Sequence, residues 1–407
     1  MSMKNLNRLL ACMSLAIALP CSALAAEGIT SDQHAGKALV SDFWSARTLQ
    51  EQQSSQQQLL DAAPDIATLY QWLRDGPVYS AAVGRGQRED ARVADDGTRF
   101  PYVYLIPDNY DPAIIYPLEF MLHGGVSRPP WEAGGDWWRR GYDAFWWHQN
   151  QAESLPAILK TLKQSYNIDD NRVTLTGVSD GGTGVYFFAF KQPTQWAAFL
   201  PYIGHPGVLR NARSGGGYQL YFENLMNRPL YIVNGEDDPL YPVSSVRPYI
   251  DMFEETGVDY VFTAIENGGH NTRWLPDEAP MIEQFKLDNP RDPLPESVQW
   301  VADRTDRYNR NLWIRIDQLA ADNSPGILQV SRQDNRITVQ ANAVAAFTLL
   351  LNPEELDFNR AITVVVNDVV QHQGMVAQDM TTLLDWARRD LDRSLLFSAE
   401  LHIEITD

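Results

Sequence analysis

Hydrophobic positions between residues 84 and 289 fall into short apolar runs separated by stretches with a helical period. The short runs predict strands at 87–93, 100–106, 118–122, 173–176, 196–203, 230–234 and 260–265. Apolar residues three and four positions apart predict helices at 155–166 and 244–256, and the run 185–190 is apolar on nearly every side. Strands that alternate with helices in this way indicate a largely parallel sheet with helices on both faces.

The chain on either side of this region has a different pattern. Residues 31–74 look helical and include a glutamine-rich stretch at 50–58. Residues 288–295 read Asp-Asn-Pro-Arg-Asp-Pro-Leu-Pro, and this proline spacing predicts an extended linker. Short alternating runs separated by turn residues follow, and they predict a β-sandwich of about one hundred residues. These runs are 312–316, 327–330, 336–340, 346–351, 361–366 and 399–405.

The N-terminus has the features of a signal peptide. Lys4 and Arg8 form a short positive region, residues 9–19 are apolar, and 23–25 read Ala-Leu-Ala, a small-residue cleavage site. We expect cleavage after Ala25 and a mature protein in the periplasm or outside the cell. A retained membrane anchor is disfavoured because the apolar run is too short to span a bilayer. The predicted parts are a signal peptide (1–25), an N-terminal helical segment (26–83), an α/β domain (84–289) and a C-terminal all-β sandwich domain (290–407).

Composition narrows the partners and the chemistry. The 407 residues carry a formal charge of −19, and an acidic surface repels nucleic-acid phosphates and anionic membranes. Both cysteines, Cys12 and Cys21, lie in the segment that we expect to be removed. The mature protein then has no thiol, disulfide or cysteine metal site, so its chemistry rests on oxygen and imidazole groups.

A sharp turn from strand to helix is predicted at residues 177–181, which read Gly-Val-Ser-Asp-Gly. The pattern Gly-x-Ser-x-Gly places its serine, here Ser179, at the exposed tip of such a turn. A Cβ atom at Gly177 or Gly181 would clash there, because the strand and helix backbones approach each other closely. Alone, the pattern also fits an ordinary glycine-rich turn, so its weight comes from the apolar strand before it and the apolar helix after it.

An acid and a histidine follow the serine, each in a loop after a predicted strand. Residues 235–239 read Gly-Glu-Asp-Asp-Pro, in which Asp238 is the first choice for the acid and Asp237 the alternative. His270 follows the strand 260–265 and is the only histidine between Asp238 and the linker. His270 is therefore the candidate base.

These motifs, together with His-Gly-Gly at 123–125 after the strand 118–122, resemble those of a known family. They look like secreted α/β-hydrolase serine esterases of the feruloyl-esterase and polyhydroxybutyrate-depolymerase-like group, which also resemble the catalytic domains of prolyl oligopeptidases. The resemblance covers about residues 84–289 and implies the α/β-hydrolase fold with a mostly parallel sheet. The tail resembles the accessory domain of some bacterial hydrolases of this kind.

The resemblance implies a Ser-His-Asp acyl-enzyme mechanism that needs no metal and no organic cofactor. Ser179 is then the nucleophile, His270 the general base, and Asp238 the acid that orients the imidazole. The backbone N–H groups of Gly125 and Asp180 are the expected oxyanion hole.

Tryptophans crowd the region after His-Gly-Gly, at positions 131, 137, 138, 146 and 147. Flat aromatic walls suit an aromatic acyl group, a sugar ring or a polyester unit, so Trp131 and Trp147 are candidate substrate contacts. His205 follows an apolar strand and is a third candidate. The alternative is that these side chains are packing residues that fix a long loop.

We expect a small-molecule or polymeric ester as the substrate, of the aromatic, plant-polysaccharide or polyester class. An ester is preferred to a peptide because no β-propeller precedes the catalytic region to admit short peptides. A prolyl-oligopeptidase-like serine peptidase and a non-catalytic binding protein on the same fold are the alternatives. A binding role does not require all three of Ser179, Asp238 and His270.

Overall fold

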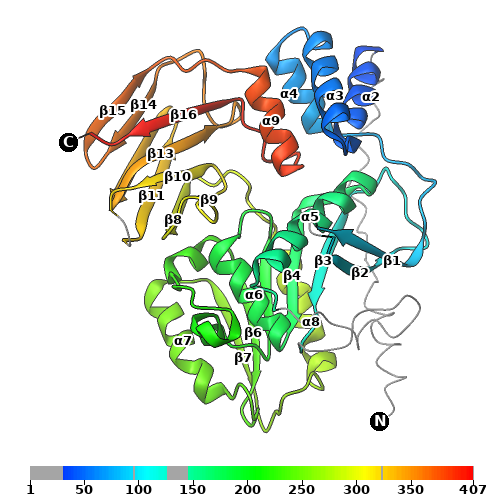
Figure 1. The fold of residues 1–407 in the computed structure, drawn as a ribbon, viewed down its shortest axis with the longest axis vertical. Helices are drawn as coiled ribbons and strands as arrows, with labels where there is room; N and C mark the ends of the chain where they lie inside the picture. The colour runs from blue at the N-terminus through cyan, green and yellow to red at the C-terminus, as the bar shows by residue number, and fades with distance from the viewer. Residues whose placement is uncertain (1–30, 95–96, 126–144, 322–323, 407) are drawn as a thin grey trace.

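A central sheet of five parallel strands organises the middle of the protein. The structure, a computed structural model, describes residues 31–94, 97–125, 145–321 and 324–406. Its central strands stand side by side in chain order (Figure 1). They are β3 (Tyr116–Leu122), β4 (Ile168–Val178), β5 (Ala198–Tyr202), β6 (Leu230–Gly235) and β7 (Tyr260–Ile265). The predicted parallel sheet of an α/β-hydrolase fold is confirmed.

Helices cover both faces of this sheet, as the alternation of its buried residues requires. Phe199 of β5 belongs to a core shared with α5 (Gln149–Ser165), α6 (Asp180–Lys191) and α7 (Val243–Thr256). Its neighbours Ala198 and Leu200 belong to a second core, which includes Ile282 of α8 (Leu275–Asp288). Helix α6 is buried from Gly181 to its last residue, as its apolar sequence predicts.

An antiparallel hairpin and a short helical turn flank the sheet. Strands β1 (Gly86–Val93) and β2 (Arg99–Ile106) match the predicted ranges to within one residue, and they pair only with each other among the described residues. The 3₁₀ turn η5 (Phe222–Asn227) carries Asn224, whose buried amide bonds the backbone of Val301 in both directions, at 2.9 and 2.8 Å. This turn ties the central region to the C-terminal strands. Across the described chain, every helix is too short or too polar to cross a membrane.

Two sheets packed around a common core form the C-terminal region. The orders are β15-β14-β12-β11-β8 and β16-β13-β10-β9, and all the pairs are antiparallel except β12 with β14. The strands are β8 (Ser297–Ala302), β9 (Arg310–Asn311), β10 (Ile314–Leu319), β11 (Gly326–Gln333), β12 (Arg336–Asn342), β13 (Val344–Leu351), β14 (Ile362–Val366), β15 (Val369–Gly374) and β16 (Ala399–Glu404). The region also contains a helix, α9 (Met380–Asp390), that the strand pattern did not predict.

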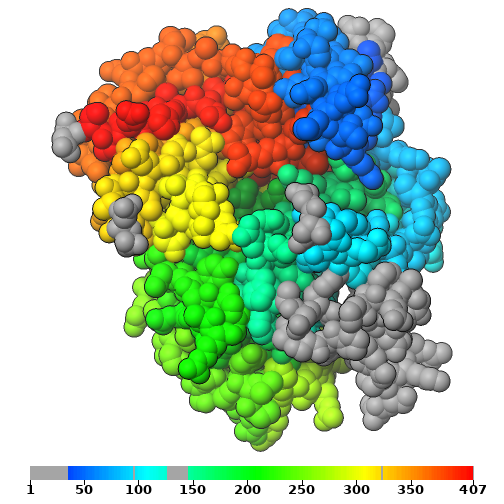
Figure 2. Space-filling view, in the orientation of Figure 1, coloured from blue at the N-terminus to red at the C-terminus, as the bar shows by residue number. Residues whose placement is uncertain are grey.

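Three N-terminal helices pack against α9 at the far end of the C-terminal region. They are α2 (Ser31–Ser45), α3 (Leu49–Ala62) and α4 (Ile66–Asp75). Leu59, Leu69, Leu383 and Leu384 are fully buried members of one cluster formed by these helices and α9. Figure 2 shows the blue N-terminal helices directly against the orange and red C-terminal chain. The N-terminal helices therefore complete a core with the C-terminal region.

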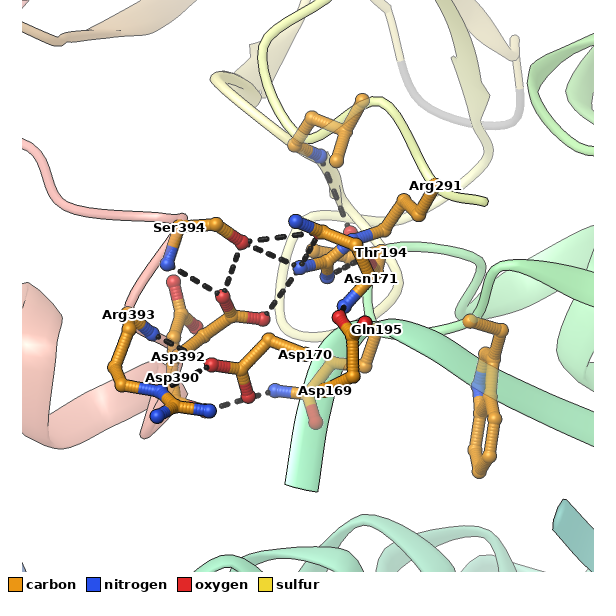
Figure 3. Close-up of polar contacts among 12 residues, drawn as sticks. Asp169, Asp170, Asn171, Thr194, Gln195, Arg291, Asp390, Asp392, Arg393 and Ser394 are labelled. Carbon is orange, nitrogen blue, oxygen red and sulfur yellow. Dashed lines mark hydrogen bonds and ion pairs between the residues drawn. The ribbon is translucent and has the colours of Figure 1, made fainter. Parts of the chain in front are cut away.

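The predicted linker at 288–295 has no regular structure after α8, yet it is anchored. The Arg291 side chain is fully buried and donates to Asn171 Oδ1 (2.8 and 3.0 Å), the Thr194 carbonyl (2.8 Å), Asp392 (2.7 Å) and Ser394 Oγ (2.9 Å) (Figure 3). A free linker would leave this arginine in water. The segment is instead part of the contact between the central sheet and the C-terminal chain.

Candidate active site

Ser179 sits on a strained turn between β4 and α6. Its φ and ψ angles are 59° and −118°, which L-residues rarely adopt. A Cβ atom at Gly177 would lie 2.3 Å from the Gly181 carbonyl oxygen, and one at Gly181 would lie 2.1 Å from that of Leu122. The steric reason predicted for both glycines therefore holds, and the turn projects Ser179 beyond the carboxyl end of the strand.

Three polar side chains from separate loops meet at this turn. His270 Nε2 lies 2.8 Å from Ser179 Oγ, and His270 Nδ1 lies 2.7 Å from Asp238 Oδ2. Because a carboxylate only accepts, Nδ1 carries the proton and Nε2 is left to accept from the serine hydroxyl. The three residues follow β4, β6 and β7, so all lie at the carboxyl edge of the parallel sheet. The structure brings together the three residues named from the sequence.

Asp238, rather than Asp237, is the acid in contact with the histidine. Its side chain is fully buried, and its second oxygen accepts from the backbone N–H groups of Leu240 and Tyr241 at 2.8 and 2.9 Å. Asp237 is exposed at the surface. The carboxylate of Asp238 is thus held in one orientation, with one oxygen left for the imidazole.

Two residues that sequence reasoning missed support this acid loop. Asn234, fully buried at the end of β6, donates to the carbonyls of Gly204 (3.2 Å) and Tyr241 (3.3 Å). The Tyr241 ring lies 5.7 Å from the His270 ring. Burial, with the nearby charges of Asp180 and Asp238, raises the pKa of Tyr241 to about 12, so the phenol stays protonated at neutral pH. The sequence contained one signal for Asn234, since it is a single polar residue at the end of an apolar strand.

The predicted oxyanion turn lies against the serine. A Cβ atom at Gly124 would be 2.7 Å from the Val178 carbonyl oxygen and 2.8 Å from Ser179 Cβ. Gly125 has a φ of 77°, in the left-handed region that favours glycine. Asp180 is the first residue of α6, at the positive end of its dipole. Backbone amides from both predicted residues therefore belong to segments that border Ser179.

The two tryptophans predicted as substrate contacts differ in what the structure shows of them. Trp131 lies outside the described residues. Trp147 is fully buried, donates to the Ser214 carbonyl (2.9 Å) and stacks on Phe145 at 4.5 Å between ring centroids. A side chain with no exposed surface cannot touch a substrate, so the prediction for Trp147 is corrected: it is a packing residue.

His205 has both ring nitrogens occupied by backbone groups. Nδ1 accepts from the Gly207 N–H at 3.0 Å, and Nε2 donates to the Ser245 carbonyl at 3.1 Å. Burial lowers the pKa of His205 below its ordinary value, which favours the neutral ring that this pattern needs. No ring nitrogen remains for a substrate, so His205 braces the loop after β5.

Comparisons with known proteins give structural similarity alone. No protein-family model matches the sequence, and no curated protein matches it. A thermostable esterase structure is similar over 50% of this chain and 63% of its own, with 20% identity and a TM-score of 0.42. An acylaminoacyl peptidase bound to a peptide chloromethyl ketone covers 51% of this chain and 42% of its own (15% identity, TM-score 0.39). Dipeptidyl peptidase 4 of Porphyromonas gingivalis covers 50% and 35% (12%, 0.38). The chain thus spans less than two thirds of each of these proteins.

Proposed function

We propose that the protein is a serine hydrolase that cleaves carboxylic esters through an acyl-enzyme. The observation that carries this proposal is the continuous hydrogen-bonded series Ser179–His270–Asp238 at the tip of a strained strand–helix turn. A serine hydroxyl is a weak nucleophile until a base accepts its proton, and the 2.8 Å contact with His270 provides that base. A binding role alone gives no reason for this arrangement.

In the first half of the reaction, Ser179 Oγ attacks the ester carbonyl carbon while its proton passes to His270 Nε2. The imidazole becomes a cation, which the buried Asp238 carboxylate stabilises from the other side of the ring. Collapse of the tetrahedral intermediate transfers the same proton to the leaving alcohol and leaves an acyl-serine. Backbone N–H groups of Gly125 and Asp180 stabilise the oxyanion, because they are oriented before charge develops.

In the second half, a water molecule replaces the alcohol. His270 accepts a proton from this water as it attacks the acyl carbon, and it then protonates Ser179 Oγ as the acid leaves. The proton transfers between Ser179 and His270 join atoms that are 2.8 Å apart in the structure. The residues named require no metal ion or organic cofactor for these steps.

The proposed substrate is a carboxylic ester of the aromatic, plant-polysaccharide or polyester class, small or polymeric. A prolyl-oligopeptidase-like peptidase is the second candidate, because the same three residues also cleave amides. The proposed site of action is the periplasm or the medium, after removal of residues 1–25. Turnover of aryl, acetyl, long-chain and feruloyl esters and of peptide anilides, measured side by side, separates the two candidates.

The first prediction concerns the nucleophile. Ser179→Ala lowers kcat on an ester by about 10⁶ while the circular dichroism spectrum and melting temperature stay near wild type. A fluorophosphonate probe labels the wild-type protein at Ser179, as mapped by mass spectrometry, and does not label the variant. The matched control is Ser331→Ala, an exposed serine of β11. Near wild-type turnover in folded Ser179→Ala, or labelling at another serine, contradicts the proposal.

A further inference from the structure

Trp146 is the aromatic residue of the segment 145–148 that contacts the predicted oxyanion turn. Its indole Nε1 donates to the His123 carbonyl at 2.9 Å, and its ring centroid lies 4.9 Å from that of His123. The neighbouring Trp147 makes its hydrogen bond to a different loop, at the Ser214 carbonyl. Two adjacent tryptophans thus brace two different loops, and Trp146 is the one of the two whose hydrogen bond is to His-Gly-Gly.

The contacts of Trp146 and His123 fix two successive peptide planes of that turn. In a trans peptide the C=O and N–H bonds point in opposite directions, so holding one orients the other. The bond from Trp146 holds the His123 carbonyl, which orients the N–H of Gly124. The His123 Nδ1–H donates to the Gly124 carbonyl at 3.3 Å, which orients the N–H of Gly125. Trp146 therefore orients the Gly124 amide directly, and it acts on Gly125, the predicted oxyanion donor, through its contact with the His123 ring.

The turn itself cannot supply this rigidity. Residues 124 and 125 are both glycine, and glycine has the largest conformational freedom in the unbraced state. The turn must nevertheless stay in contact with the nucleophile, because Gly124 packs against Val178 and Ser179. Its orientation therefore has to be held by contacts from outside the two glycines.

We propose that Trp146 is a positioning residue for the oxyanion hole. This inference rests on the proposed function, since it assigns Trp146 to the tetrahedral intermediate of acyl transfer. Trp146 does not touch the reacting atoms; it holds the His123 carbonyl so that the following amides point at the developing oxyanion. Loss of one oxyanion donor costs 10²–10³ in kcat, and a misplaced donor retains part of its effect. Loss of the indole N–H is therefore expected to cost about 10- to 100-fold.

The test is Trp146→Phe, which keeps an aromatic ring beside His123 and removes the donor. On a soluble aryl ester, kcat falls by about 10- to 100-fold, and KM changes by less than about threefold because ground-state binding does not use the oxyanion. The matched control is Trp313→Phe in the C-terminal region. This variant also loses one hydrogen bond from a buried indole to a backbone carbonyl, that of Pro295 at 3.1 Å. Its kcat stays at the wild-type value whatever its melting temperature.

A transition-state analogue gives a readout that a structural role does not move. Phenylboronic acid adds to a nucleophilic serine and forms a tetrahedral anion. Its inhibition constant for Trp146→Phe rises by the same factor by which kcat falls, whereas Trp313→Phe leaves it unchanged. A second variant, Gly184→Ala, displaces Trp146 by steric contact. The added Cβ would lie 2.5 Å from Trp146 Cβ, so the indole has to shift. If Trp146→Phe does not fold, Gly184→Ala is measured in its place. Its kcat is expected to fall and its inhibition constant to rise by the same factor.

The outcomes separate this inference from the proposed function. A wild-type protein that binds the boronate, with Trp146→Phe and Gly184→Ala binding it equally well, overturns the role of Trp146 alone. A rise in KM with kcat unchanged in Trp146→Phe also overturns the role of Trp146. A wild-type protein that hydrolyses no ester and forms no boronate adduct at Ser179 contradicts the proposed function, and the role of Trp146 with it.

Discussion

At the scale of single residues, the site is held mainly by backbone groups. The Asp238 carboxylate receives two backbone N–H bonds on one oxygen, which leaves the other for His270. His205 is likewise bound by backbone on both ring nitrogens. Groups fixed in this way need not reorganise during a reaction, which is where a preorganised site gains its rate.

The second prediction separates the two acids of the loop. Asp238→Asn lowers kcat by about 10⁴, because an amide in place of the carboxylate favours the wrong histidine tautomer. Asp237→Asn, the matched control one residue away, leaves kcat near wild type because this side chain is exposed and the hydrogen bond from residue 237 to Gly268 is made by its backbone N–H. Steady-state kinetics on one aryl ester suffice. A large loss at 237 with none at 238 would transfer the role to Asp237.

Sequence reasoning named the three side chains that meet at the strand–helix turn and missed the residues that support them. Ser179, Asp238 and His270 are identifiable because each occurs in a short motif and the motifs come in a fixed order. Asn234 and Trp146 bind carbonyls of Gly204 and His123, and no local pattern tells which distant carbonyl lies nearby. Trp147 shows the converse: two adjacent tryptophans look alike in sequence, and packing alone decides which one is fully buried.

At the scale of elements, helix α9 does more than join two strands. Its Leu383, Leu384 and Ala387 lie in the cluster shared with the N-terminal helices. Arg388 adds polar contacts, donating to the carbonyls of Phe43 (3.3 Å) and Gln52 (3.0 Å), with its guanidinium 3.9 Å from the Phe43 ring centroid. The helix thus anchors α2 and α3 to the C-terminal sheets.

The third prediction follows from this anchoring. Leu383→Ala removes a fully buried side chain from the cluster and lowers the free energy of unfolding by about 2–5 kcal/mol. Thr381→Ala, an exposed position on the same helix, is the control and changes it by less than about 0.5 kcal/mol. Urea titrations of both proteins measure the difference. Equal stabilities of Leu383→Ala and Thr381→Ala would mean that the packing of α9 does not stabilise the N-terminal helices.

The elements were predictable where their hydrophobic pattern extended far enough. Strands β6 and β7 and helix α7 match the predicted ranges to within a residue or two. Strands β8, β9 and β15 were missed, since β9 has two residues and β15 is mostly exposed or polar. Helix α9 had usable signals: Asp379 caps it through the Thr382 N–H, and its buried residues at 383, 384 and 387 have helical spacing. A search for alternating strands passed over them.

At the scale of the whole molecule, one of the attachments of the C-terminal chain lies at the end of β4 away from the site. Arg291 binds Asn171, and Arg393 binds Asp170 through its backbone N–H (3.0 Å) and its guanidinium (3.1 Å). Eight residues at about 3.3 Å each separate Asn171 from Ser179, roughly 26 Å. Stability and turnover are therefore expected to respond to different mutations.

The fourth prediction uses this separation. Asp392→Asn leaves the buried Arg291 guanidinium without its carboxylate and costs about 3–5 kcal/mol of unfolding free energy. The control is Glu354→Gln, which breaks the half-exposed pair with Arg74 and costs less than about 1 kcal/mol. In both folded variants kcat stays within about twofold of wild type, because the sites are far apart. A selective loss of kcat in Asp392→Asn would show coupling between the network and Ser179.

The same carboxylate gives stability a pH dependence. Burial raises the pKa of Asp392, but the charges of Arg291 and Lys163 outweigh burial and hold this pKa well below its ordinary value. A depressed folded-state pKa stabilises the protein above the unfolded-state pKa of about 4, and the contribution is lost as the pH falls further. The melting temperature of the wild type therefore declines more steeply below about pH 4 than that of Asp392→Asn.

The packing of α2–α4 against α9 also sets an order of events in synthesis. Helices α2–α4 are made before the central sheet and α9 is made after it, so the apolar faces of α2–α4 stay uncovered while the residues between them are made. Contacts between such distant segments form slowly and expose the growing chain to aggregation. The cluster that these helices share with α9 can therefore form only after Met380–Asp390 has been made. A circular permutant that places Met380–Asp390 ahead of Ser31–Ser45 would reduce the sequence separation between these helices and is expected to fold faster.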